Sequence, residues 1–151
     1  MTKVSCSFAA SDFPIGKSAA LKTATILIPT RWQTLEKHPL KEVKTDNRTL
    51  YIDGKQFELE HRIKDVRIIN NLAVVIYDFD ENAPRHRQFQ NCKAFDSNGE
   101  LIWTAEHPTN MTADSYVEFM KGRGNKLWNF GGFICELDFK SGKLKNSVFT
   151  K

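Results

Sequence analysis

The sequence predicts a mainly β protein: a curved antiparallel sheet, a sandwich or a partly open barrel of about nine strands, with one short helix near 112–120. Its apolar residues fall in short runs with a period of two, which is the spacing of side chains on one face of a strand. Pairs of turn-forming residues separate these runs. The 151 residues, 40% of them hydrophobic, suffice for one continuous core, so we expect a single domain over 1–151.

Two hairpins are expected in the first half of the chain. Asp53-Gly54 is a strong hairpin signal, because both residues of a two-residue turn of this kind need a positive φ angle. Asn70-Asn71 gives a similar signal, and the run after it, Leu72–Phe79, is the most apolar of the chain and is expected to be a central strand. The strands expected in this half are 21–28, 49–53, 56–60, 63–69 and 72–79.

The one helix is expected at 112–120. Thr112 can cap its N-terminus, while Ala113, Val117 and Met120 fall on one face. Gly122 follows shortly after and can end it. The strands expected in the second half are 89–95, 101–105, 126–130, 133–138 and 143–149.

The composition argues against several classes of protein. No run approaches the roughly 20 apolar residues of a membrane-spanning helix, and the N-terminus lacks the apolar stretch of a secretory signal. We therefore expect a cytoplasmic protein without a membrane partner. Three widely spaced cysteines, Cys6, Cys92 and Cys135, favour reduced thiols, the latter two within the core. No cofactor or metal motif is complete, so none is expected.

The net charge of +4 is unevenly distributed along the chain. Residues 71–120 carry three Lys or Arg and eight Asp or Glu, whereas residues 121–151 carry seven and two. A surface of two signs favours protein contacts over nucleic acid, which requires a continuous positive footprint.

The densest charged segment is the candidate partner-binding site. Asp78, Asp80 and Glu81 end the most apolar strand, and Arg85 and Arg87 follow in a polar loop. The acids match a divalent-cation site only in part, because the Gly and the distal Glu of a calcium loop are absent, so a solvated strand end is favoured. The two guanidinium groups offer planar forks for carboxylate or phosphate. Exposed loops often carry function, so we expect these five residues to contact a partner.

Two further functions stay open as alternatives. Nucleic acid could bind the basic C-terminal region if at least two of its aromatic rings were exposed on one face, although aromatic residues in strands usually belong to the core. A small nuclease-like enzyme could use the histidines, but no pairing of nucleophile and base is visible, and the sequence predicts no catalytic residue. The aromatic set is Trp103, Trp128, Phe130 and Phe133 beside Lys126 and Lys143, and the histidines are His38, His61, His86 and His107.

The C-terminal half resembles a group of small bacterial proteins. Ala94–Trp103 (AFDSNGELIW), Asn129–Asp138 (NFGGFICELD) and Ser141-Gly142-Lys143 look like immunity-type proteins encoded beside polymorphic or contact-dependent toxins, over about residues 70–151. The resemblance implies a non-catalytic protein that binds a cognate toxin domain tightly and blocks its active site or its access to substrate. Inhibitors of basic nuclease toxins are usually acidic, whereas this chain is basic overall. Either the acidic residues of 71–120 supply the complementary charge, or the toxin is itself acidic.

Overall fold

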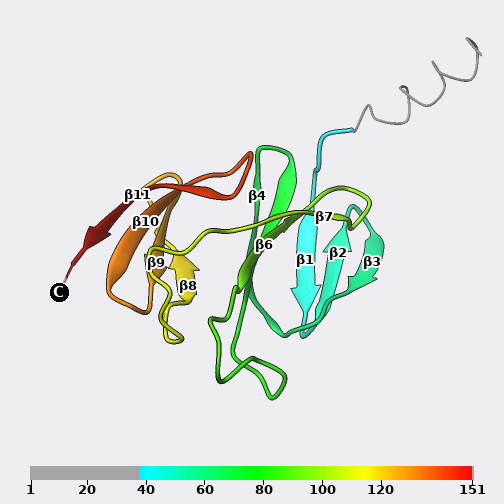
Figure 1. Ribbon diagram of the computed structural model, residues 1–151. Helices are drawn as coiled ribbons and strands as arrows, with labels where there is room; N and C mark the ends of the chain where they lie inside the picture. Colours follow the sequence, from blue (N-terminus) through cyan, green and yellow to red (C-terminus); the bar gives the residue numbers. More distant parts are fainter. Residues whose placement is uncertain (1–37, 151) are drawn as a thin grey trace, which may run out of the picture. The chain divides into compact units, whose positions relative to one another are not determined.

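The computed structural model describes residues 38–150, which form three antiparallel sheets and no helix (Figure 1). Within each sheet, strands that follow one another in the sequence pair with one another, so every sheet is a meander. The predicted mainly β class is confirmed for these residues. The first sheet contains β1 (Val43–Asp46), β2 (Thr49–Ile52) and β3 (Lys55–Glu58); the second contains β4 (Ile63–Ile69), β5 (Leu72–Tyr77), β6 (Cys92–Phe95) and β7 (Leu101–Thr104); the third contains β8 (Tyr116–Phe119), β9 (Lys126–Asn129), β10 (Phe133–Asp138) and β11 (Lys143–Phe149).

The observed strands differ in number from the predicted ones. Residues 38–150 contain eleven strands rather than about nine, and none of their sheets closes into a barrel. The sequence pattern did not predict β1, because three of its four residues are exposed and it lacks an apolar alternation. All three sheets belong to one unit of the chain, Pro39–Lys151. The predicted strand 21–28 and Cys6 lie outside the described residues.

Both predicted hairpins are confirmed. Asp53 and Gly54 have φ angles of 47° and 84° and join β2 to β3. Asn70 and Asn71 have φ angles of 51° and 63° and join β4 to β5. Positive φ at both central residues matches the right-handed twist of the flanking strands, which is why the local sequence was sufficient to locate these turns.

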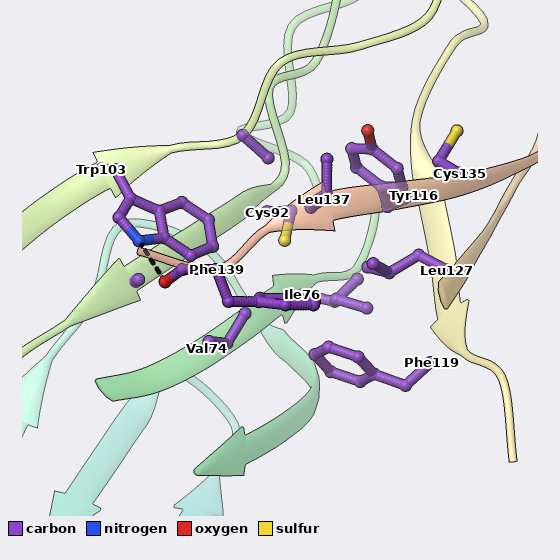
Figure 2. Close-up of a cluster of buried hydrophobic side chains, with 12 residues drawn as sticks. Val74, Ile76, Cys92, Trp103, Tyr116, Phe119, Leu127, Cys135, Leu137 and Phe139 are labelled. Atoms are coloured by element: carbon purple, nitrogen blue, oxygen red, sulfur yellow. Dashed lines mark hydrogen bonds between the residues drawn. The ribbon is translucent and has the colours of Figure 1, made fainter. Parts of the chain in front are cut away.

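The central strand β5 is buried on both faces, as predicted. Five of its six residues are buried, and they alternate between two hydrophobic clusters because successive side chains of a strand point in opposite directions. Val74 and Ile76 belong to the cluster that the second sheet forms with the third (Figure 2). Ala73, Val75 and Tyr77 belong to the cluster that the second sheet forms with the first.

The predicted helix at 112–120 is wrong. Its second half is β8, which pairs with β9, and both Tyr116 and Phe119 are buried. A β-bulge between Tyr116 and Glu118 adds one residue, so that two side chains three positions apart reach the same core. The Tyr-Val-Glu-Phe sequence also favours a strand by its aromatic and β-branched residues. Tertiary packing therefore overrode the helical spacing of Ala113, Val117 and Met120.

The connection between β7 and β8 is anchored by the buried carboxylate of Asp114. Its Oδ2 accepts hydrogen bonds from the N–H of Thr109 at 2.7 Å and from the hydroxyl of Thr109 at 2.6 Å. Its Oδ1 accepts one from Asn129 Nδ2 and lies 3.4 Å from His107 Nδ1. The side chain of His107 is 2% exposed, and its Nε2 has no hydrogen-bond partner within 38–150. Burial lowers the pKa of His107, although Asp114 opposes this effect.

Two glycines with positive φ give a matched test of the packing between the second and third sheets. A Cβ on Gly142 (φ 76°) would lie 2.6 Å from the Trp103 ring, whereas a Cβ on Gly54 (φ 84°) would meet no atom within 4 Å. We expect Gly54→Ala to lower the free energy of unfolding by about 1 kcal/mol through backbone strain alone. Gly142→Ala should lower it by about 2–4 kcal/mol, because overpacking adds to the same strain. Chemical denaturation of both variants measures the difference, and equal losses would contradict the contact with Trp103.

The buried His107 predicts that acid destabilises the fold. Its folded pKa is lowered, so its contribution to stability is complete above the unfolded pKa of about 6.5 and is lost as pH falls from there towards the folded pKa. We expect His107→Gln, which keeps a donor but does not titrate, to lose less stability than the parent protein between pH 7 and pH 5. Denaturation curves across this range provide the comparison. An unchanged pH dependence in the variant would show that His107 is not the responsible group.

Candidate functional site

An open cleft of about 920 Å³ lies between the end of β5 and strands β8 and β9. Three large aromatic side chains in it are exposed to solvent, namely Phe79 (51%), Trp128 (36%) and Phe130 (60%). Arg85, from the loop after β5, and Lys64, from β4, also line it. The second and third sheets thus both contribute to one concave surface.

The floor of the cleft is held together by the side chain of Asn91, which is 1% exposed. Its Nδ2 donates to the carbonyl oxygens of Tyr77 at 3.0 Å and Tyr116 at 2.7 Å, and its Oδ1 accepts from the N–H of Tyr116 at 2.9 Å. The backbone oxygen of Asn91 accepts from the N–H of Tyr77 at 2.8 Å. A single residue thereby bonds to the backbone of β5 and of β8, much as a short intervening strand would.

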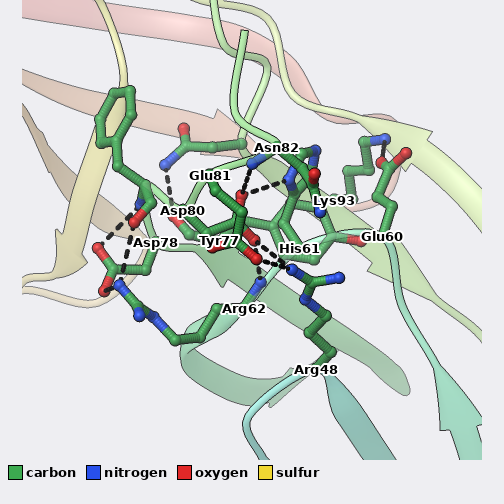
Figure 3. A network of polar contacts seen from close by, with 12 residues as sticks. Arg48, Glu60, His61, Arg62, Tyr77, Asp78, Asp80, Glu81, Asn82 and Lys93 are labelled. Carbon is green, nitrogen blue, oxygen red and sulfur yellow. Dashed lines mark hydrogen bonds and ion pairs between the residues drawn. The ribbon is translucent and has the colours of Figure 1, made fainter.

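The acidic segment after β5 forms a polar network with arginines and a histidine (Figure 3). The carboxylate of Asp80 is 2% exposed and lies at its centre. It accepts hydrogen bonds from the N–H groups of Arg62 and Asn82, both at 3.0 Å, and it pairs with His61 Nδ1 at 3.1 Å. Arg48 lies 3.7 Å from the same carboxylate and 2.6 Å from Glu81.

Asp80 is stabilised in its charged form. Burial alone would raise the pKa of its carboxyl group, but the hydrogen bonds from Arg62 N–H, from the His61 ring and from Asn82 N–H outweigh burial. The pKa of Asp80 is consequently held below its ordinary value. An ionised and fully engaged carboxylate of this kind fixes the backbone around it.

Phe79, one of the exposed aromatic residues of the cleft, is held in place by Arg62 and Phe89. Arg62 Nη2 donates to Asp78 Oδ2 at 2.9 Å and to the carbonyl oxygen of Phe79 at 3.0 Å. The ring of Phe79 packs on that of Phe89, with the ring centres 5.2 Å apart. Phe89 is itself buried and packs on His61, so the exposed ring of Phe79 rests on a buried support.

The structure divides the five residues that the sequence predicts as partner contacts. Asp78, Asp80 and Glu81 are each engaged by Arg48, Arg62 or His61. Arg85 and Arg87 are exposed, and neither forms a hydrogen bond or ion pair with any part of 38–150. Only Arg85 of the two arginines lines the aromatic cleft. Arg87 lines a smaller recess of about 370 Å³ that contains Glu60 and Lys93.

Of the four aromatic residues considered for nucleic-acid binding, two are exposed in the cleft. Trp128 and Phe130 line it, whereas Trp103 is buried and donates through Nε1 to the carbonyl oxygen of Phe139 at 3.0 Å. Phe133 packs on Phe149 at a ring distance of 5.2 Å. The sequence did not identify Phe79, although its place between Asp78 and Asp80 marks it as a ring beyond the apolar strand. The spacing of Trp128 and Phe130 by two residues was the signal for a shared face.

The cysteines and histidines occupy separate environments. Cys92 and Cys135 are buried in the core, as predicted, and burial raises the pKa of the Cys135 thiol to about 11. His61 pairs with Asp80 and His107 with Asp114, whereas His38 and His86 are exposed. Within 38–150 no hydrogen bond or ring contact joins any two of these histidines.

In 38–150 no group of three or more His, Cys, Asp or Glu side chains is arranged to hold a metal ion. No helix in this part of the chain is long and apolar enough to cross a membrane.

One protein family matches the part of the chain that contains the strands and the cleft. The model of a family described as "Domain of unknown function (DUF7957)" matches residues 40–149. No curated protein and no solved structure matches the chain. The matched segment includes every strand from β1 to β11 and all residues that line the cleft. The chain therefore belongs to the DUF7957 family.

Proposed function

We propose that this protein is a non-catalytic protein-binding module that captures its partner in the aromatic cleft. The observation that carries the proposal is the exposure of Phe79, Trp128 and Phe130 in one cleft beside Arg85. Aromatic residues and arginine dominate the binding energy of protein interfaces, because they bury a large area at a low entropic cost. Exposed rings gathered in one place also mark interaction sites on soluble proteins.

The walls of the cleft support the proposal through their rigidity. Asn91 bonds to the backbone on both sides of the floor, and Arg62 holds the backbone at Phe79. A surface that is ordered before binding loses less conformational entropy when the partner arrives. A concave site with fixed walls suits a protruding segment of the partner better than a flat contact.

We propose further that the partner is a cognate bacterial toxin domain and that the protein acts as its cytoplasmic inhibitor by occlusion. The support is the resemblance of 94–103, 129–138 and 141–143 to immunity-type proteins. The second of these segments contains Phe130, which lines the cleft. Blocking of an active site requires only tight binding, and it fits a protein for which we propose no catalytic residue.

Binding of single-stranded nucleic acid is the second candidate function. Trp128 and Phe130 are two exposed rings of one cleft, which is the condition that this alternative required. Bases stack on such rings, while cations such as Lys64 and Arg85 attract phosphates. Affinity for nucleic acid should then fall log-linearly with rising salt, which is the test that separates it from a protein partner.

Cleft substitutions should weaken capture of the partner. We expect the immobilised full chain to retain one stoichiometric protein from lysate of its native host, in the presence of nuclease. The double variant Trp128→Ala/Phe130→Ala should retain at least tenfold less, because hot-spot truncations cost about 2 kcal/mol or more. Phe149→Ala is the matched control, since Phe149 is 56% exposed and does not line the cleft.

Co-expression then tests the inhibitor role. The captured protein, expressed alone in a bacterial host, should arrest growth, and the parent chain should restore growth while the double variant should not. Capture that is unaffected by the cleft substitutions, or recovery of nucleic acid alone, would contradict the proposal. A captured protein that is harmless to the host would leave a binding module that is not a toxin inhibitor.

Three of the five charged residues should differ in whether their substitution affects stability or binding. Asp80→Asn should lower the free energy of unfolding by about 1–3 kcal/mol, because a buried, multiply bonded carboxylate loses its charge. Glu81→Gln should change it by less than about 1 kcal/mol, since the side chain is 76% exposed. Arg85→Ala should leave it within about 0.5 kcal/mol of the parent but weaken capture of the partner. Urea denaturation and the retention assay, run on the same preparations, check both parts.

A further inference from the structure

We infer that the partner inserts into the cleft a segment of its chain that carries an acidic side chain next to a large apolar one. This inference rests on the proposed protein-binding function and specifies its recognition chemistry. It follows from the charges that line the cleft and have no partner, and from the rings that lie beside them.

The acidic groups of the cleft are already neutralised from within. Asp78 pairs with Arg62 at 2.9 Å, and Arg62 does not line the cleft. Asp80 is 2% exposed and is bonded by backbone N–H groups and by His61. The Asp78 side chain is 39% exposed, but its Oδ2 accepts from Arg62 and its Oδ1 accepts from the N–H of Phe79. Both carboxylates therefore already have partners within the protein.

The cations of the cleft are not neutralised. Lys64 and Arg85 are exposed, and neither forms a hydrogen bond or an ion pair anywhere in 38–150. The uncompensated charge of the cleft is therefore positive, and its complement is an anion. The planar guanidinium of Arg85 can take a carboxylate with two parallel hydrogen bonds, and partial exclusion of water strengthens them.

The exposed aromatic rings of the cleft indicate which kind of side chain lies next to the partner's carboxylate. Phe79, Trp128 and Phe130 present faces and edges of large area in the same cleft. A Phe, Tyr, Trp or Leu of the partner would cover them and displace water from around the Arg85 pair. The complementary segment thus combines an Asp or Glu with a bulky apolar residue.

A protein segment fits these features better than a nucleic acid does. A strand of nucleic acid carries a phosphate at every nucleotide. Proteins that bind single strands contact this backbone through a positively charged groove. Within residues 38–150 the lining of the cleft offers only two uncompensated cations, Lys64 and Arg85. A single carboxylate with an apolar neighbour does not need an extended positively charged groove.

The test is selection of random peptides on the intact protein. A displayed library of random 12-residue peptides is enriched on the immobilised full chain, and the selected peptides are sequenced, synthesised and measured by fluorescence polarisation. We expect an Asp or Glu within a few positions of an aromatic residue or Leu. Affinity should fall at least tenfold with Arg85→Gln, and equally when that Asp or Glu of the peptide becomes Asn or Gln. The two changes together should cost little more than either alone, because they remove the same pair.

Arg87→Gln is the matched control. Arg87 is an exposed arginine two positions away, has no partner within 38–150 and does not line the cleft, so its loss should change affinity less than twofold. Enrichment of basic or uncharged peptides, binding that survives Arg85→Gln, or retention of no peptide at all would each overturn the inference. Tighter, Arg85-dependent binding of a dT12 oligonucleotide would overturn it in favour of nucleic acid.

Failure of this inference and failure of the proposed function give different results. If the native partner is lost with Trp128→Ala/Phe130→Ala but selected peptides lack acids, the cleft binds protein by another chemistry. If selected peptides are acidic and depend on Arg85 while no native protein is captured, the recognition chemistry holds without the toxin partner.

Discussion

The arrangement of the second and third sheets depends on one buried amide. The side-chain Nδ2 of Asn91 donates to the carbonyl oxygens of Tyr77 and Tyr116, and its Oδ1 accepts from the N–H of Tyr116. The backbone oxygen of Asn91 accepts from the N–H of Tyr77. Loss of this amide would leave the N–H and C=O of Tyr116 without these partners at the floor of the cleft, which is costly away from water. The apolar cluster of the two sheets supplies the bulk of the packing, but it is not directional. The amide is what fixes how the end of β5 faces the start of β8.

The residues that line the cleft come from the place where the second and third sheets meet. Phe79 follows β5, Val117 lies on β8, and Trp128 lies on β9, so its walls come from both sheets. The acids beside it serve the fold, because Arg48, Arg62 and His61 engage them. This use of the acids leaves the positive charges of the cleft unopposed. The sequence left both signs open, because the acidic block could face a basic partner and the guanidinium groups of Arg85 and Arg87 could face a carboxylate or a phosphate.

Local chemistry explains what the sequence could predict. The hairpins at Asp53-Gly54 and Asn70-Asn71 depend on φ angles that those residues adopt at low cost, and the burial of β5 depends on its own apolar run. The failed helix at 112–120 depended on distant partners instead. Asp114 bonds to Asn129, and Tyr116 bonds to Asn91, across separations that no periodicity encodes. Residues 43–46 form a strand through pairing with β2 and not through their own pattern.

The same distinction holds for the site. The charged segment at 78–87 could be found from its composition, but composition could not tell Asp80, buried in a network, from Arg85, open to solvent. That division requires the positions of Arg48 and Arg62, which come from other parts of the chain. The function of a charged residue is set by which opposite charges the fold places beside it. In this protein the carboxylates bond to groups of the fold itself, whereas the guanidinium of Arg85 stays exposed beside three aromatic rings. A partner that enters the cleft would therefore contact Arg85 and these rings.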